Sequence, residues 1–248
     1  MTEQAFHTLG ETRPSRWLVT CDHASNQVPD WVAGGDLGIA PDDMARHIAW
    51  DVGAAGVSAA LAERLDAPCI LSDFSRLVID PNRGEDDPTL VMKLYDGTII
   101  PANRHIDDAG TLERLIRLYR PYHDALARLA ARQPDTVIVA IHSFTPCLRG
   151  REPRPWHVGV LYSDLDERLS KPLLRLLAAQ PDLCVGDNQP YAGYLPGDAI
   201  DCHALQHGRQ NTLIEVRNDL IADAAGQAGW ADRLAPALMA ALAEATPA

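Results

Sequence analysis

Short apolar runs alternate along the chain with longer segments in which apolar residues recur three and four positions apart. The runs have the length and β-branched content typical of buried strands, and the longer segments have the spacing of helices that pack one face on a core. The predicted strands are Trp17–Cys21, 68–72, 77–80, 136–141, 158–162 and 211–216. The predicted helices are 51–66, 109–132, 165–180 and 229–245, the second interrupted at Pro121, which lacks an amide hydrogen.

Strands that alternate with helices predict a largely parallel sheet covered by helices on both faces, which is a three-layer α/β/α fold. The 248 residues fit a single domain, 1–248, because the chain contains no internal repeat and no linker that would divide it. The loops 81–108 and 185–210 are long for a compact domain. Long loops of this kind usually build a binding or catalytic site.

The chain is acidic, since 22 Lys and Arg against 34 Asp and Glu give a formal net charge of −12. Nucleic acids and anionic membranes attract clustered cations, so neither is expected as a partner. A small anionic substrate is compatible with this charge, because a few local arginines suffice to bind it. No run approaches the ~18 apolar residues of a membrane helix, and the N-terminal segment lacks the apolar stretch of a signal peptide. We therefore expect a cytoplasmic protein.

Polar side chains with catalytic potential follow three of the predicted strands. His23 comes after the first strand, His142 ends the strand 136–141, and Glu215 lies near the end of the last strand. Ligands of open α/β sheets bind beyond the carboxyl ends of the strands, where these three residues would meet. Imidazole and carboxylate are zinc ligands, and a spare carboxylate beside zinc can act as a general base. The alternative is that each is an ordinary loop residue hydrogen-bonded to the backbone.

A second group of polar residues surrounds the predicted strand 77–80. Arg76 and Arg83 flank this strand, and Asp80 and Asn82 are placed to orient them. Paired arginines suit a substrate carboxylate, or a carbonyl oxygen that gains charge during attack. The alternative, which composition alone slightly favours, is two surface arginines that balance the acidic residues at 85–87.

Five sequence blocks occur in order along the chain: CDHASNQVP, HIAWDVGA, SRLVIDPNR, IHSF and IEVRNDLI. Together, from about Trp17 to Leu242, they resemble the N-formylglutamate amidohydrolase family. That family is similar to the zinc carboxypeptidases and to the succinylglutamate desuccinylase–aspartoacylase group. The resemblance implies a three-layer α/β/α fold with a mixed, largely parallel sheet of about eight strands.

The resemblance also implies one bound Zn²⁺, with His23 and His142 as two of its ligands. The related enzymes have a glutamate three residues after the first histidine, but this chain has Asn26 there, and an amide oxygen is a poor zinc ligand. Asp51 is the favoured third ligand because it restores a carboxylate to the set. His47 is the other candidate, and a helix-capping role for Asp51 is the alternative.

The remaining roles implied by the resemblance concern the substrate. Glu215 would be the catalytic base, and Arg76 would polarise the scissile carbonyl. The residues implied to contact the substrate or support the site are Asn82 and Arg83, which would bind a carboxylate, together with His203 and Ser143.

The position of Glu215 within its strand can be predicted from the residues alone. Strand side chains alternate between the two faces, so Glu215 should point away from the side taken by Ile214 and Val216. The same alternation puts Arg217 on the face of Glu215, and a structural ion pair between them is the alternative to a catalytic role.

The function implied is a metal-dependent amidohydrolase that converts N-formyl-L-glutamate, or a related N-acyl amino acid, to formate and L-glutamate. Its partner would be a small anionic N-acyl amino acid. One alternative is a zinc carboxypeptidase-like peptidase, which the modest length disfavours. Another is a non-catalytic small-molecule-binding relative, against which Glu215 argues, because a binding protein needs no general base.

Overall fold

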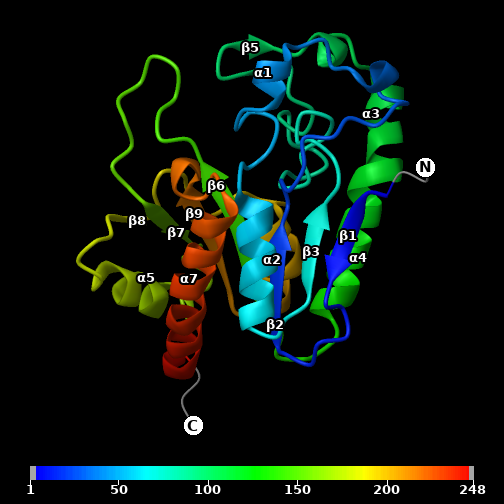
Figure 1. Cartoon of the computed structure of the whole chain (residues 1–248). Helices are drawn as coiled ribbons and strands as arrows, with labels where there is room; N and C mark the ends of the chain where they lie inside the picture. The colour runs from blue at the N-terminus through cyan, green and yellow to red at the C-terminus, as the bar shows by residue number, and fades with distance from the viewer. Residues whose placement is uncertain (1–3, 246–248) are drawn as a thin grey trace.

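A seven-stranded mixed sheet forms the centre of the protein (Figure 1). In the computed structural model, which describes residues 4–245, the strands run in the order β1-β3-β2-β6-β9-β7-β8. Their bounds are β1 Phe6–Leu9, β2 Trp17–Cys21, β3 Cys69–Ser72, β6 Val137–Phe144, β7 Val158–Leu161, β8 Val185–Asp187 and β9 Asn211–Arg217. β1 is antiparallel to β3 and β7 is antiparallel to β9, whereas the other neighbours are parallel.

Helices cover both faces of this sheet, which confirms the predicted three-layer α/β/α fold (Figure 1). One face carries α2 (Ala54–Arg64), α5 (Ser170–Ala178) and α7 (Ala224–Ala245). The other carries the π-helical turn Leu115–Tyr119, α4 (Arg120–Ala130) and α6 (Ala199–His203). The helix α3 (Asp108–Arg114) leads directly into the π-helical turn. A short helix α1 (Pro41–Met44) and the hairpin β4–β5 (Leu94–Tyr95 and Thr98–Ile99) lie outside these layers. Within residues 4–245, no helix is both long and apolar enough to cross a bilayer.

The strand side chains divide between two cores in strict alternation. In β2, Val19 packs into the core beneath α2 and α7, whereas Leu18 packs into the core beneath α4. In β6, Val139 and Ile138 divide in the same way. Both strands are buried along their whole length, as expected for central strands covered on two faces. The same alternation determines which polar side chains at the strand ends share one side of the sheet.

Several predicted elements differ from the observed ones. The segment 77–80 is a buried irregular loop, not a strand. Its backbone carbonyls accept hydrogen bonds from side chains instead of from a neighbouring strand: Asn103 donates to the carbonyl of Leu77, and Arg114 donates to that of Val78. The helix predicted at 165–180 begins only at Ser170. The sheet has seven strands, close to the expected number of about eight, and neither of its edge strands, β1 and β8, was predicted. The interruption expected at Pro121 is observed as the π-helical turn between α3 and α4.

Candidate active site

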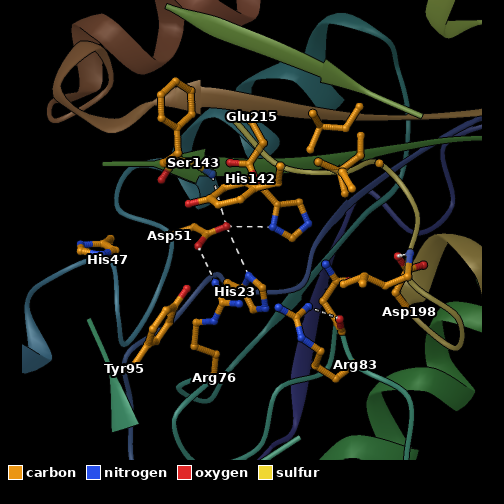
Figure 2. A pocket seen from close by; sticks show the side chains of 18 residues that line it. His23, His47, Asp51, Arg76, Arg83, Tyr95, His142, Ser143, Asp198 and Glu215 are labelled. Carbon is orange, nitrogen blue, oxygen red and sulfur yellow. Dashed lines mark hydrogen bonds and ion pairs between the residues drawn. The ribbon is translucent and has the colours of Figure 1, made fainter. Parts of the chain in front are cut away.

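A cavity of about 280 Å³ opens where β2, β6 and β9 end (Figure 2). The ends of these strands bring His23, His142 and Glu215 into its wall. The loop that precedes α2 adds Asp51, and the irregular loop after β3 adds Arg76. Residues from five separate segments therefore meet at one edge of the sheet. In open α/β folds, this edge is where ligands bind.

His23, Asp51 and His142 form a buried group that could hold a metal ion. One ligand atom from each residue lies within 4.8 Å of the others. The Nδ1 atoms of His142 and His23 are 2.8 and 3.3 Å from Oδ2 of Asp51. Two imidazoles and one carboxylate are a donor set that zinc accepts in catalytic sites. The residues present thus fit a divalent metal of the zinc class.

Asp51 reaches this group because it does not cap the helix that follows it. Gly53 is the N-cap residue of α2, and no side chain makes a capping hydrogen bond there. The carboxylate of Asp51 instead accepts hydrogen bonds from the backbone N–H of Ser143 (3.2 Å) and from Arg76 (3.4 Å). Burial alone would raise the pKa of Asp51, but His23 and His142 lower it below its ordinary value. Asp51 is therefore an anion turned towards the two histidines.

A second layer of carboxylates holds the outer nitrogens of the two histidines. Nε2 of His23 lies 2.7 Å from Oδ1 of Asp80, and Nε2 of His142 lies 3.2 Å from Oδ2 of Asp22. Asp22 also accepts a hydrogen bond of 2.5 Å from the hydroxyl of Tyr122. Metal-binding histidines usually donate their second nitrogen to a carboxylate in this way. The sequence analysis missed Asp22 and this contact of Asp80, and the only sequence signal was an acidic residue directly before His23.

Arg76 is buried, which excludes the surface-arginine alternative for this residue. Its Nη2 and Nε donate to Oδ2 of Asp80 at 2.8 and 3.2 Å. Its guanidinium lies 5.5 Å from the ring centre of Tyr95. Burial would lower the pKa of Arg76, but Asp80 raises it above its ordinary value, so the side chain stays charged. A fixed cation therefore lines the cavity beside the histidine–aspartate group.

Asn82 and Arg83 line another part of the cavity. Oδ1 of Asn82 accepts a hydrogen bond from the backbone N–H of Ala199 (3.2 Å), so the amide group of Asn82 keeps its N–H donors for other partners. Arg83 donates to Thr89 and to the backbone of Asn82, and within residues 4–245 it forms no ion pair. The acidic stretch at 85–87 does not neutralise it, since Glu85 pairs with Arg120.

Glu215 lies directly across the β6–β9 ladder from His142. Ile214 and Val216 pack into the core on the other side of the sheet, so the predicted alternation is correct. Burial raises the pKa of Glu215 to about 7, and Oε2 is buried without a hydrogen-bond partner among the described residues. Arg217 pairs with Asp219 at 2.8 Å, which excludes the structural ion pair with Glu215.

The other residues named from sequence occupy different positions. Asn26 donates to the carbonyl of Met44 and is not among the residues that line the cavity. His47 lines the cavity but is separate from that group in Figure 2, and burial lowers its pKa to about 4. Ser143 lines the cavity, and its hydroxyl donates to the carbonyl of Val52.

His203 is not part of the cavity wall. Its Nε2 lies 2.8 Å from Nδ1 of His123, and the two rings stack with their centres 5.1 Å apart. The other ring nitrogen of His123 donates to the carbonyl of Pro81 at 2.9 Å, so this pair supports the loop that carries Asn82. A direct contact between His203 and substrate stays a prediction.

Most of the rest of the cavity wall comes from the two long loops and was not predicted residue by residue, whereas Phe144, Leu161 and Leu213 come from strands. Loop 81–108 supplies Tyr95 from the β4–β5 hairpin, and loop 185–210 supplies Tyr191 and Asp198. Burial raises the pKa of Asp198 to about 6, and its carboxylate accepts hydrogen bonds from the backbone N–H of Leu195, in the loop, and of Asp201, in α6. Loop side chains follow no periodic pattern, so their direction could not be read from sequence.

Comparisons with known proteins agree with this geometry. Residues 15–222 match the profile of the family described as N-formylglutamate amidohydrolase. The crystal structure of gene product Atu2144 from Agrobacterium tumefaciens is similar, with 34% identity, a TM-score of 0.91 and coverage of 97% of this chain and 96% of that chain. The search of curated proteins found no match.

A second similar structure is the N-formylglutamate amidohydrolase from Ralstonia eutropha JMP134. It is 22% identical, with a TM-score of 0.73 over 97% of this chain and 98% of that one, and it supports the fold. The family profile spans most of the chain, including all the strand ends that build the cavity. The chain therefore belongs to the N-formylglutamate amidohydrolase family and is a hydrolase that acts on amide bonds.

Proposed function

We propose that this protein is a metal-dependent hydrolase of small N-acyl amino acids, with N-formyl-L-glutamate as the simplest substrate. Hydrolysis of that compound gives formate and L-glutamate. Membership of the family supports the reaction type, and the name of the Ralstonia eutropha structure supports the substrate class. The non-catalytic alternative has less support, because the cavity contains a buried carboxylate with a free oxygen beside the candidate metal group.

The observation that carries this proposal is the convergence of His23, Asp51 and His142, with Glu215 next to His142 on the adjacent strand. The three ligand residues would hold one Zn²⁺ or a similar divalent ion. When bound, such an ion supplies Lewis-acid chemistry: it makes water more acidic and polarises a carbonyl. Asp80 and Asp22 would keep both imidazoles oriented for this role.

Glu215 is the proposed general base. It would take a proton from the attacking water and then deliver it to the nitrogen of the leaving amino acid. A base works best when its pKa is near the working pH. Burial raises the pKa of Glu215, whereas a divalent cation bound beside it would lower that pKa, so the base role rests on the position of the carboxylate beside the candidate metal group. The free Oε2 atom gives the proton a position to occupy.

Arg76 and the Asn82–Arg83 pair would bind different parts of the substrate. Arg76 would donate hydrogen bonds to the carbonyl oxygen as its negative charge grows, and Asp80 already holds the guanidinium in place. Arg83 and the N–H donors of Asn82 would bind the carboxylate of the amino acid. Ser143 supports the group through its backbone N–H, which holds Asp51.

The test is release of formate from N-formyl-L-glutamate by the purified protein. Treatment with a chelator should abolish activity, and added Zn²⁺ should restore it. The variant Glu215→Gln should retain its metal, measured by elemental analysis, while kcat falls by at least ~10²-fold. The variant His23→Ala should lose the metal instead. Near-normal kcat in Glu215→Gln, or full activity of the metal-free protein, would contradict the proposal.

A further inference from the structure

The arginines around the cavity differ in whether a carboxylate of the protein neutralises them. Arg76 is paired with Asp80 and Asp51 at 2.8 and 3.4 Å. Arg83 lines the cavity and Arg154 lies directly behind its wall, and within residues 4–245 neither of them forms an ion pair. The cavity therefore has two cations that are left for the charges of a ligand.

Arg154 is fixed to the end of β6, the strand that carries His142. Its Nη1 donates to the carbonyl of Thr145, the first residue after that strand, at 3.2 Å. Its guanidinium lies 5.7 Å from the ring centre of Phe144 and 5.0 Å from that of Tyr191. These contacts hold the cation in place before a ligand arrives, which reduces the entropy cost of binding.

The hydroxyl of Tyr191 connects Arg154 to the cavity. Nη1 of Arg154 donates to the hydroxyl oxygen at 3.1 Å, and the hydrogen of that hydroxyl has no acceptor in the described part of the chain. Burial, and after it the charges of Glu215 and Tyr95, raise the pKa of Tyr191 to about 12, so the hydroxyl is close to both of these cavity residues. A hydroxyl that accepts from a cation is polarised and donates more strongly to an anion. Tyr191 thus offers a free donor to the cavity.

The positive charge of Arg154 is also effective inside the cavity. Burial lowers the pKa of His47, a cavity residue, to about 4, and Arg154 is among the cations that contribute to this decrease. The carboxylate of Asp96 lies 3.5 Å from Nε2 of His47 and opposes the decrease, but Asp96 is paired with Arg46 at 2.6 Å. Asp96 is therefore already neutralised, and a bound anion would be attracted to Arg154.

The two unpaired cations lie at different ends of the cavity. Figure 2 shows His47 and Tyr95 on one side of the candidate metal group and Arg83 on the opposite side. The Tyr191–Arg154 pair belongs to the first side, since each of its members interacts electrostatically with one of those two residues. A ligand with two carboxylates could pair with both cations while its amide bond lies over the metal group.

We propose that the Tyr191–Arg154 pair is a subsite for a second carboxylate, so that the cavity selects N-acyl derivatives of dicarboxylic amino acids over those of monocarboxylic ones. The hydroxyl of Tyr191 donates to an oxygen of this carboxylate, and Arg154 behind it balances the charge. Arg83, with the N–H donors of Asn82, holds the other carboxylate. Tyr191 touches the substrate, whereas Arg154 is a positioning residue. This inference names the substrate class of the proposed amidohydrolase function and rests on that function.

The first test pairs each carboxylate with its cation. With zinc-loaded protein, kcat and KM are measured for N-formyl-L-glutamate, for N-formyl-L-glutamine, which lacks the side-chain charge, and for N-formyl-L-isoglutamine, which lacks the α-carboxylate charge. Arg154→Gln and Tyr191→Phe should raise KM for N-formyl-L-glutamate at least ~10-fold with little change in kcat. They should have the same effect on one monoamide and little effect on the other, whose remaining carboxylate lies at Arg83.

The matched controls are Arg151→Gln and Tyr194→Phe. Arg151 is exposed in the same loop as Arg154, and Tyr194 lines an outer groove, not this cavity. Circular dichroism and melting curves verify that all four variants fold. An equal loss for all three substrates would indicate a merely structural role of the Tyr191–Arg154 pair, and no loss for any of them would indicate no role. Either result overturns the inference.

A second measurement separates this inference from the proposed function. Calorimetry compares the binding of glutarate, a dicarboxylate without an amide bond, with that of pentanoate, the monocarboxylate of the same chain length. Glutarate should bind at least ~10-fold more tightly, and Arg154→Gln should remove this preference. If the protein hydrolyses none of the three formyl compounds but shows this preference, the proposed function fails and the subsite stands. If it hydrolyses N-formyl-L-glutamate but binds both acids equally, the inference alone fails.

Discussion

Asp51 and Asp80 are the two carboxylates that join the catalytic groups to one another. Asp51 contacts both histidines and Arg76. Asp80 contacts His23 and Arg76, and it also accepts the backbone N–H of Asn82. Burial would raise the pKa of Asp80, but Arg76 and His23 hold it well below its ordinary value, so this side chain is a permanent anion. Asp80 thus orients the candidate metal ligand His23, the cation Arg76 and the loop that carries Asn82.

The first prediction concerns this connecting role. Asp80→Asn keeps the size of the side chain but removes its charge, so His23 loses its anionic partner and we expect metal affinity to fall ~10–100-fold. Competition with a chromogenic chelator measures that affinity. Asp73→Asn is the matched control, because Asp73 forms a similar 2.7 Å contact with His7 in an exposed position. Equal affinities in both variants would mean that Asp80 does not support a metal ligand.

The second prediction separates the two arginines by their kinetics. Arg83→Ala should raise KM by at least ~10-fold with little change in kcat, because a carboxylate is bound equally in ground and transition states. Arg76→Ala should lower kcat by ~10²–10³-fold, because the carbonyl oxygen gains charge only near the transition state. Steady-state kinetics on N-formyl-L-glutamate distinguish these outcomes. A small, equal effect of both substitutions would argue against both roles.

At the scale of residues, the sequence analysis could identify the groups that end strands but not the groups that support them. His23, His142 and Glu215 follow apolar runs, and the direction of strand side chains is periodic. Asp22 also follows an apolar run, but its supporting role cannot be read from that position, because a buried acid is stable only when distant partners such as His142 and Tyr122 reach it. Those partners become neighbours only in the folded chain.

At the scale of elements, the junction between Asp51 and α2 is a point where two backbones approach closely. Gly53 has φ = 83°, in the left-handed region that favours glycine. A Cβ atom at this position would lie 2.2 Å from the carbonyl oxygen of Ile221. The close approach of the two backbones therefore requires a residue without a side chain, and it positions Asp51 two residues earlier.

The third prediction tests this junction. Gly53→Ala should destabilise the protein by more than the ~1–2 kcal/mol cost of a left-handed alanine, because Ile221 must also move. Gly34→Ala is the matched control, since Gly34 has φ = 73° and a Cβ there would meet nothing within 4 Å. Urea denaturation measures both. We also expect weaker metal binding in Gly53→Ala only, and identical stability of the two variants would show that the junction tolerates displacement.

The bounds of the strands were predicted most accurately where the strand is buried on both faces of the sheet. β2 matches its predicted bounds, and β9 differs from them by one residue. The segment 77–80 has the composition of a strand but no neighbouring strand with which to pair, so side chains such as Asn103 bond its backbone instead. Composition reports burial, whereas strand formation also requires a partner, and a single sequence does not identify that partner.

At the scale of the whole molecule, the partly buried pair His123–His203 makes folding stability depend on pH. Burial and the neighbouring His123 lower the pKa of His203 to about 3, and burial lowers the pKa of His123. An unfolded histidine binds a proton below about pH 6.5. The unfolded chain therefore binds more protons than the folded one as the pH falls below 6.5, and folding stability decreases over the range from pH 6.5 towards 3.

The fourth prediction follows from this decrease of folding stability at low pH. Between pH 7.5 and pH 5, His203→Gln should lose about 2 kcal/mol less folding free energy than the unmodified protein, because glutamine binds no proton in either state. Urea denaturation at several pH values measures the difference. His105→Gln is the matched control, because His105 is exposed and meets water in both states. Parallel pH profiles for His203→Gln and the unmodified protein would refute this account.

The direct pairing of His142 with Glu215 across β6 and β9 also determines which parts of the site can be altered by mutation without moving these two groups apart. Adjacent strands are spaced roughly 4.8 Å apart by their backbone hydrogen bonds, so the separation of these two groups does not depend on the loops. The side walls, in contrast, belong to the hairpin and to the long segment that carries Tyr191. Laboratory evolution or loop exchange between relatives can therefore diversify substrate choice while the reactive groups keep their spacing, which makes this scaffold suitable for combinatorial libraries.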